Sequence, residues 1–150
     1  MPIQISSPQG KRIKLWFLLI LLPVLLTAFS GCAGNAAVVK AGIGETFTIG
    51  IGQTAQITDE DMVITFNEII GDSRCPKGVT CIWAGVVSAR VTIDYKGDSY
   101  PLALNQPGLT SPVTEVFFNY TLTYDISPYP TAGEALSDKD YRLTVTLTKV

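Results

Sequence analysis

The chain has 150 residues, with 11 Lys and Arg, 13 Asp and Glu, and no His. Three of the basic residues, Lys11, Arg12 and Lys14, precede a long apolar run, so the chain after residue 31 carries 8 basic and 13 acidic residues, a formal charge of −5. A mildly acidic chain without clustered Lys and Arg argues against nucleic-acid binding and against attraction to an anionic lipid surface. The lack of His removes the commonest general base and a common metal ligand.

The first 32 residues are typical of an export signal. A basic start is followed by an apolar run from Leu15 to Phe29, which is too short and too Pro-interrupted for a comfortable membrane span. The run ends in Phe29-Ser30-Gly31-Cys32, which resembles the lipobox of bacterial lipoproteins. The resemblance implies that residues 1–31 are a cleaved signal peptide and that Cys32 becomes the lipidated first residue, with a thioether-linked lipid and an acyl chain such as palmitate. The competing interpretations are a transmembrane anchor and a plain signal peptide.

The lipobox resemblance implies a protein tethered to a cell membrane on its extracytoplasmic face. Ala33 stands where an inner-membrane retention signal has Asp, and the choice between inner and outer membrane stays open. Residues 32–44 are rich in Ala and Gly, so we expect a lipidated Cys followed by a flexible tether. Residues 45–150 are enough for one domain with one core.

Apolar and polar residues alternate through most of residues 45–150, which predicts half-buried strands. The clearest strand spans residues 87–95, where the period of two holds over nine residues. The other predicted strands lie at residues 46–51, 55–57, 63–67, 100–104, 116–126 and 141–148. The segment 116–126 reads as one long strand or as two joined by a bend, and only Ala132 to Lys139 suggests a short helical turn. The predicted fold class is all-β, an antiparallel sandwich or small barrel of about seven or eight strands behind a signal peptide.

The alternation of apolar and polar residues stops at the segment that contains Cys75 and Cys81, which have five residues between them. Pro76 follows the first Cys and Gly78 lies inside the segment, which fits a disulfide that closes a tight loop between strands. Export permits such a bond. Zinc is the rival interpretation, but the chain offers neither His nor a second Cys pair to complete a tetrahedral site. We therefore expect a disulfide, no metal and no cofactor.

A family resemblance rests on the same residues. The pattern Asp72-Ser73-Arg74-Cys75-Pro76, a spacer, and Cys81-Ile82-Trp83-Ala84-Gly85 is similar to a group of uncharacterised small bacterial secreted or lipoprotein domains. The likeness extends through weaker signals to residues 45–57 and 120–141. It implies a fold and an exported location, and it brings no activity with it.

The motif has a structural and a functional interpretation. In the structural one, Asp72 binds loop amides or pairs with Arg74, Trp83 covers the disulfide as a core aromatic, and Gly85 supplies a bulge or a positive φ. In the functional one, the loop presents Arg74, Lys77 and Trp83 to a partner. Trp and Arg are enriched in binding hot spots, and a disulfide lowers the cost of ordering the loop.

Catalysis finds little support, because no nucleophile elbow and no phosphate-binding Gly loop occurs. Acidic residues at 59–61 and at 138 and 140 are candidates for calcium ligands or for solvated turn caps. The aromatics are candidates for a ligand cleft or for strand core: Phe117, Phe118, Tyr120, Tyr124 and Tyr129. We expect a lipid-anchored binding or structural module that meets a protein of the cell envelope and is not an enzyme. A small-molecule or calcium-binding lipoprotein is the alternative, and an enzyme is favoured least.

Overall fold

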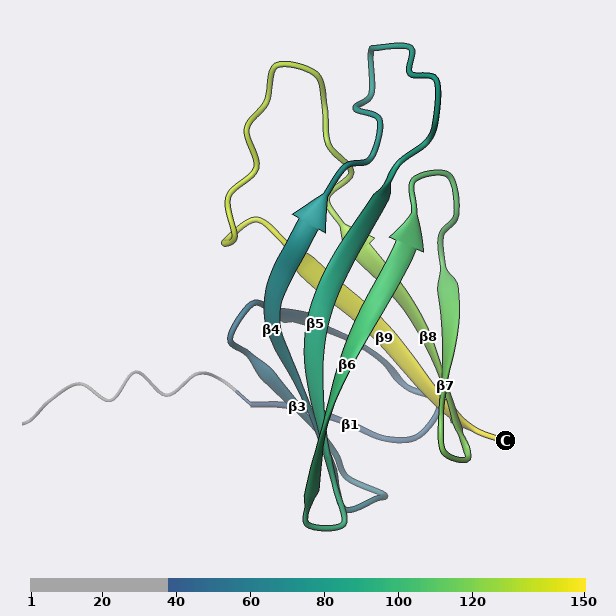
Figure 1. The fold of residues 1–150 in the computed structure, drawn as a ribbon. Helices are drawn as coiled ribbons and strands as arrows, with labels where there is room; N and C mark the ends of the chain where they lie inside the picture. The colour runs from purple at the N-terminus through teal and green to yellow at the C-terminus, as the bar shows by residue number, and fades with distance from the viewer. Residues whose placement is uncertain (1–37) are drawn as a thin grey trace, which may run out of the picture. The chain divides into compact units, whose positions relative to one another are not determined.

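The computed structural model describes residues 38–150, which fold into two β-sheets that pack face to face (Figure 1). One sheet has the strand order β1-β3-β4-β5-β6 and the other has the order β2-β9-β8-β7. The strands are β1 Val39–Ala41, β2 Thr46–Gly50, β3 Thr54–Ile57, β4 Met62–Asp72, β5 Val86–Tyr95, β6 Asp98–Pro107, β7 Val113–Phe117, β8 Tyr120–Ser127 and β9 Arg142–Lys149. The predicted all-β sandwich is confirmed. The signal peptide and Cys32 lie outside the described residues.

The alternating residues of the sequence form the core between the sheets. On β5, Val87, Ala89, Val91 and Ile93 are fully buried, while the residues between them point away from the core. The facing β8 and β9 contribute a matching set, namely Tyr120, Leu122, Tyr124, Ile126, Leu143, Val145 and Leu147. Burial of each large apolar side chain contributes about 1.5–3 kcal/mol, so this two-layer core supplies the main driving force for folding.

The N-terminal boundary of the folded part differs from the expectation. Residues Val39–Ala41 form β1, which pairs in parallel with β3 in the register Val39 to Ala55. The sandwich therefore begins inside the segment 32–44 that we expected to be tether, and it is not purely antiparallel. A three-residue strand in an Ala- and Gly-rich stretch is too short to show a period in the sequence.

The structure decides two segments that the sequence left open, and it gives two strands rather than one long strand in the first of them. The alternation through residues 116–126 belongs to two antiparallel strands, β7 and β8, because the chain reverses at Phe118 and Asn119. Phe118 takes a left-handed φ of 51° there, and its ring packs against Tyr95 and Tyr100. The segment Ala132 to Lys139 holds turns and no helix.

The free edge of β6 is protected. Pro101 removes one backbone donor from this strand, and the Tyr124 hydroxyl donates to the Asn105 carbonyl at 2.9 Å. Both features blunt an edge that would otherwise pair with another chain. The Tyr124 contact also ties β6 of one sheet to β8 of the other.

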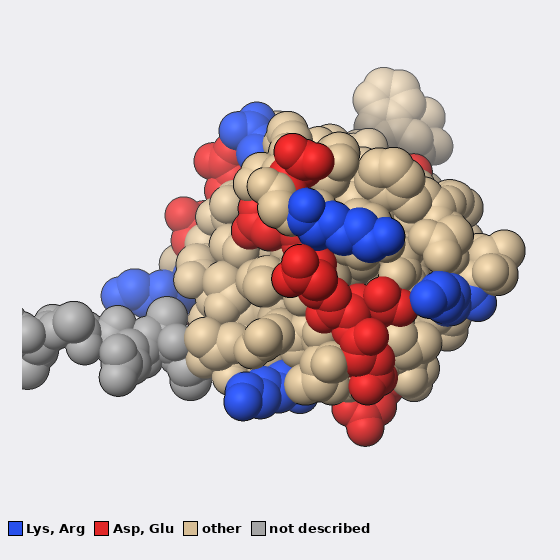
Figure 2. Space-filling view, turned by 90° about the horizontal axis from the view of Figure 1, so that it is seen from below, with Lys and Arg blue, Asp and Glu red and all other residues tan. Residues whose placement is uncertain are grey.

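The two ends of the sandwich differ in character. The loops that follow β4, β6 and β8 lie together at one end (Figure 1). The opposite end holds the β3–β4 turn and the β5–β6 hairpin, and acidic side chains gather on it (Figure 2). Within residues 38–150 there is no helix that is long and apolar enough to cross a membrane.

Candidate functional site

The loop between β4 and β5 is closed by the predicted disulfide. Cys75 and Cys81 are bonded, with their Cα atoms 5.9 Å apart. Below the ring, the two arms of the loop are joined by backbone hydrogen bonds from Ser73 N to Val86 O and from Cys75 N to Ala84 O, each 2.9 Å long. The loop is therefore held both covalently and by a ladder that continues the β4–β5 pairing.

Two glycines allow the loop to cross its neighbours closely. Gly85 has a φ of +71°, and a Cβ at this position would lie 1.9 Å from the Ser73 carbonyl oxygen. Gly108, at the start of the β6–β7 loop, donates to the Gly85 carbonyl at 2.9 Å, and a Cβ there would lie 2.2 Å from the Ala84 carbonyl oxygen. The positive φ expected at Gly85 is confirmed, and side chains are excluded where these two loops meet.

Arg74 is buried, with only 4 % of its surface exposed. Its guanidinium pairs with Asp72 through Nε and Nη2, at 2.9 and 2.5 Å, and lies 5.0 Å from the centre of the Tyr129 ring. The remaining contacts run from Nη1 to the Ile126 carbonyl and from Nη2 to the Pro128 carbonyl, each 2.9 Å long. This corrects the expectation that Arg74 faces a partner, because its side chain joins the disulfide loop to the end of β8.

Asp72 supports this arrangement from the end of β4. It accepts the Arg74 backbone N–H at 3.1 Å and the Tyr141 hydroxyl at 3.1 Å, in addition to the guanidinium. Burial of Asp72 opposes ionisation, but the hydrogen bonds and charge of Arg74 outweigh it, so the pKa of Asp72 lies below its ordinary value. The expected pairing of Asp72 with Arg74 and with loop amides is confirmed.

The disulfide loop is also joined to the β8–β9 loop. Lys77 N donates to the Pro130 carbonyl at 2.9 Å, and Ala132 N donates to the Lys77 carbonyl at 3.0 Å. The Lys77 ammonium lies 5.7 Å from the centre of the Tyr129 ring on an exposed part of the loop. Three loops from both sheets thus form one connected end.

Large apolar side chains protrude from this end. Ile82 is 97 % exposed and Trp83 is 77 % exposed, although both follow Cys81 directly. Val79 on the same loop and Leu109 on the β6–β7 loop are also exposed. We call Val79, Ile82, Trp83 and Leu109 the apolar tip. Trp83 does not cover the disulfide as a core aromatic, because most of its side chain faces solvent.

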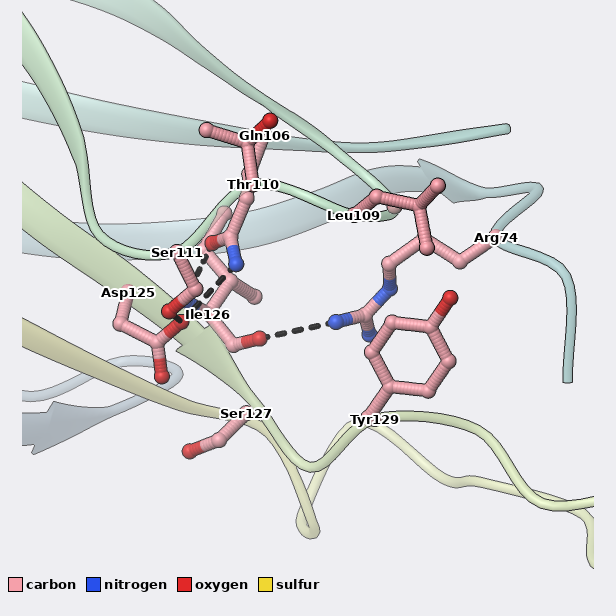
Figure 3. Close-up of a pocket in the computed structure, with 10 residues that line it drawn as sticks. Arg74, Gln106, Leu109, Thr110, Ser111, Asp125, Ile126, Ser127 and Tyr129 are labelled. Atoms are coloured by element: carbon pink, nitrogen blue, oxygen red, sulfur yellow. Dashed lines mark hydrogen bonds between the residues drawn. The ribbon is translucent and has the colours of Figure 1, made fainter. Parts of the chain in front are cut away.

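A pocket of about 380 Å³ opens beside the tip, between β6 and the end of β8 (Figure 3). Gln106, which is only 3 % exposed, donates from Nε2 to Asp125 Oδ1 at 2.8 Å and accepts the Ile126 N–H at 2.6 Å. Ser111 also donates to Asp125 Oδ1. We call this the polar pocket, and its chemically important lining residues are Arg74, Gln106, Thr110, Ser111, Asp125 and Tyr129.

The acidic and aromatic groups singled out in the sequence have structural partners. Asp59 accepts the Ile43 N–H, Glu60 pairs with Lys149, and Asp140 accepts the Ser137 N–H, each at 2.8 Å. No group of three or more Cys, Asp or Glu is placed to hold a metal ion within residues 38–150. Tyr120 and Tyr124 belong to the core, and among the five aromatics only Tyr129 lines the polar pocket.

Comparisons of the chain with protein-family models, with curated proteins and with solved structures gave no match. The resemblance of the Cys75–Cys81 motif to small bacterial envelope domains therefore stays a prediction. The polar pocket was not found from the sequence, because its residues come from β4, β6, the β6–β7 loop and β8. The one indication of the pocket in the sequence is that Gln106, a polar residue, stands two residues after Leu104 and so falls on the inward face of β6.

Proposed function

We propose that this chain is a lipid-anchored, extracytoplasmic binding domain that docks a protein of the cell envelope through the apolar tip. The observation that carries the proposal is the exposure of Ile82 and Trp83, at 97 % and 77 %, on a loop that a disulfide closes. The export signal, the lipobox at Cys32 and the disulfide support the location.

The stiffness of the loop favours a role in recognition. Exposed apolar side chains that gather in one place mark interaction sites, and Trp is the residue most enriched in binding hot spots. The disulfide, the hydrogen bonds at Ser73 and Cys75, and the bridge at Lys77 fix the loop before any partner arrives. Binding therefore loses little conformational entropy, which leaves more of the contact energy for affinity.

Chain length favours a protein partner over the bilayer that would carry Cys32. Val39 lies level with Ala55 and Ile64 in the five-stranded sheet. Asp72 lies about 20 Å further along the sheet, because Ile93 and Val87, the β5 partners of Ile64 and Asp72, are six residues apart at about 3.3 Å per residue. The disulfide loop lies beyond Asp72, whereas the chain from Cys32 to Val39 reaches at most about 25 Å. With Cys32 at the membrane, the tip would reach that membrane only if residues 32–39 were almost fully extended along the sandwich.

The charged residues of the disulfide loop limit the kind of protein surface that fits it. Between Ser73 and Gly85 the charged residues are Arg74, which Asp72 neutralises, and Lys77, which is exposed at the side of the tip. A complementary partner has an apolar groove for Ile82 and Trp83 and an acidic group near Lys77. Lys77 stays a proposed contact to the partner, at the rim of the apolar tip.

Site-specific photocrosslinking in living cells tests the proposal. A photoreactive amino acid at Ile82 of the full-length protein should form an adduct with one envelope protein, identified by mass spectrometry. The matched control is the same group at Val116, an apolar residue that is 65 % exposed on β7. The second substitution Trp83→Ser should remove the Ile82 adduct while the amount and melting temperature of the protein stay unchanged.

Three outcomes would count against the proposal. Adducts of equal yield at Ile82 and Val116 would mean contact without specificity. Adducts with lipid alone would place the tip at the membrane. The absence of any adduct at Ile82 in cells that express the protein at its natural level would remove the proposed partner.

A further inference from the structure

The polar pocket exists because the C-terminal end of β8 extends beyond β7, one of its two neighbouring strands. β7 begins at Val113, which pairs with Tyr124, so residues 125–127 of β8 have no neighbouring strand on that side. The backbone of Ile126 is bound by side chains instead, its N–H by Gln106 and its carbonyl by Arg74 (Figure 3). The space left between these side chains and the β6–β7 loop is the pocket of about 380 Å³.

Donors and acceptors without a hydrogen-bond partner occur among the residues that line this pocket. A guanidinium has five N–H donors, and four of those of Arg74 are engaged, which leaves one on Nη1. Asp125 accepts its two hydrogen bonds, from Gln106 and Ser111, on Oδ1, so Oδ2 accepts none from the described residues. The hydroxyl of Thr110 likewise makes no hydrogen bond there.

The charges around the pocket select against anionic ligands, and its hydrogen-bonding groups favour a neutral ligand over a cation. Asp72 neutralises Arg74, and the carboxylate of Asp125 would repel an anion. A cation would pair with Asp125, but it offers no acceptor to the free N–H on Arg74 Nη1. A neutral group that both donates and accepts satisfies Arg74 and Asp125 together, and a hydroxyl is the simplest group of this kind.

We propose that the polar pocket binds a neutral saccharide, with one sugar ring inside it. Adjacent sugar hydroxyls would accept from Arg74 Nη1 and donate to Asp125 Oδ2, and the wall formed by Tyr129 offers apolar contact to the ring carbons. The pocket volume lies at the lower end of the roughly 300–1,000 Å³ usual for small-molecule sites, which suits one ring. This site is distinct from the apolar tip, and neither proposal requires the other.

Ligand-observed NMR on the full-length protein tests the site. The protein is kept in micelles of a detergent without a sugar headgroup, and glucose, galactose, mannose and N-acetylglucosamine are titrated one at a time. At least one should bind with a millimolar or tighter dissociation constant. Asp125→Asn keeps the shape and the Oδ1 acceptor but replaces the Oδ2 acceptor with an NH2 donor, and Thr110→Val removes a lining hydroxyl. Asp125→Asn should weaken binding at least tenfold, and Thr110→Val should weaken it measurably.

Asp98→Asn is the matched control, since Asp98 begins β6 at the opposite end and should leave the affinity unchanged. Thermal melting of each variant confirms that it is folded, and Thr110→Val, an exposed change, keeps the test valid if Asp125→Asn unfolds. The proposal is overturned if none of the four sugars binds, or if binding survives both pocket substitutions. It is also overturned if glucosamine or glucuronate binds and the neutral sugars do not.

Discussion

Gln106 and Ile126 are joined as if they belonged to neighbouring strands, although they lie in different sheets. The side-chain Oε1 of Gln106 accepts the Ile126 N–H at 2.6 Å, and Arg74 Nη1 donates to the Ile126 carbonyl at 2.9 Å. Two side chains from the five-stranded sheet and its loop thus replace the strand that β8 lacks. The loop end owes its order to these contacts as well as to the disulfide.

Gln106→Leu should destabilise the sandwich by about 1–3 kcal/mol, because it leaves the buried Ile126 N–H without an acceptor. Urea denaturation measures the free energy of unfolding. Ser88→Ala, which removes an exposed side-chain hydrogen bond to Asn105, is the control and should change stability by less than about 0.5 kcal/mol. Equal effects of the two substitutions would show that Gln106 does not replace a strand contact.

Arg74→Met should cost about 3–5 kcal/mol, because it leaves the Asp72 carboxylate and two carbonyls without their partner. Arg90→Met is the matched control. Arg90 pairs with Glu68 at 2.8 Å, but both side chains are about half exposed, so its loss should cost less than about 1 kcal/mol. The double variant Asp72→Asn/Arg74→Met should be more stable than Arg74→Met alone, because it also removes the unpaired carboxylate. A double variant that is less stable would show that the unpaired carboxylate of Asp72 is not the cause of the loss.

Acid should weaken the domain through Asp72. The pKa of Asp72 in the folded state lies below its ordinary value of 3.8, because Arg74 outweighs the cost of burial. A lowered pKa contributes stability that is present above about pH 4 and is lost as the pH falls through the folded value. The free energy of unfolding, measured from pH 6 to pH 2, should therefore fall less steeply for Asp72→Asn than for the wild type. Parallel curves would exclude this role.

Removal of the disulfide should affect the tip more than the core. Cys75→Ser/Cys81→Ser opens a small ring, which costs about 2 kcal/mol on the loop-entropy estimate. The chain has two Trp residues, and Trp16 lies in the predicted signal, so Trp83 reports the tip in the processed protein. Its fluorescence anisotropy should fall in the double variant while far-ultraviolet circular dichroism stays unchanged. Unchanged anisotropy would mean that the backbone hydrogen bonds of Ser73 and Cys75 are enough to order the loop without the disulfide.

The sequence predicted the body of the fold because its strands bury one face and expose the other. Residues 87–95 show this period without interruption, and the buried residues of β5 match it one for one. Segments without such a period were misjudged. β1 is three residues long. The buried face shifts from the odd-numbered residues of β7 to the even-numbered residues of β8, so the exposed Val116 and Phe118 look in the sequence like a continuation of the buried face of β8.

The site was harder to predict because it depends on distant contacts. Asp72 and Arg74 are near neighbours in the chain, and their pairing was foreseen, but the burial of Arg74 comes from carbonyls of Ile126 and Pro128. The polar pocket joins Arg74, Gln106 and Asp125 across two sheets, and no local pattern links them. Trp83 was singled out as a candidate for partner binding, which stays a prediction, and its exposure is not evident from the neighbouring residues in the sequence.

The docking proposal depends first on where the protein resides, and the chemistry at Cys32 decides this. Mass spectrometry of the protein extracted from cell membranes measures it directly. The account predicts an N-terminal peptide that begins at Cys32 and carries a diacylglyceryl group on its sulfur. A mature protein that begins at Met1, or one whose Cys32 is a free thiol, would contradict the account.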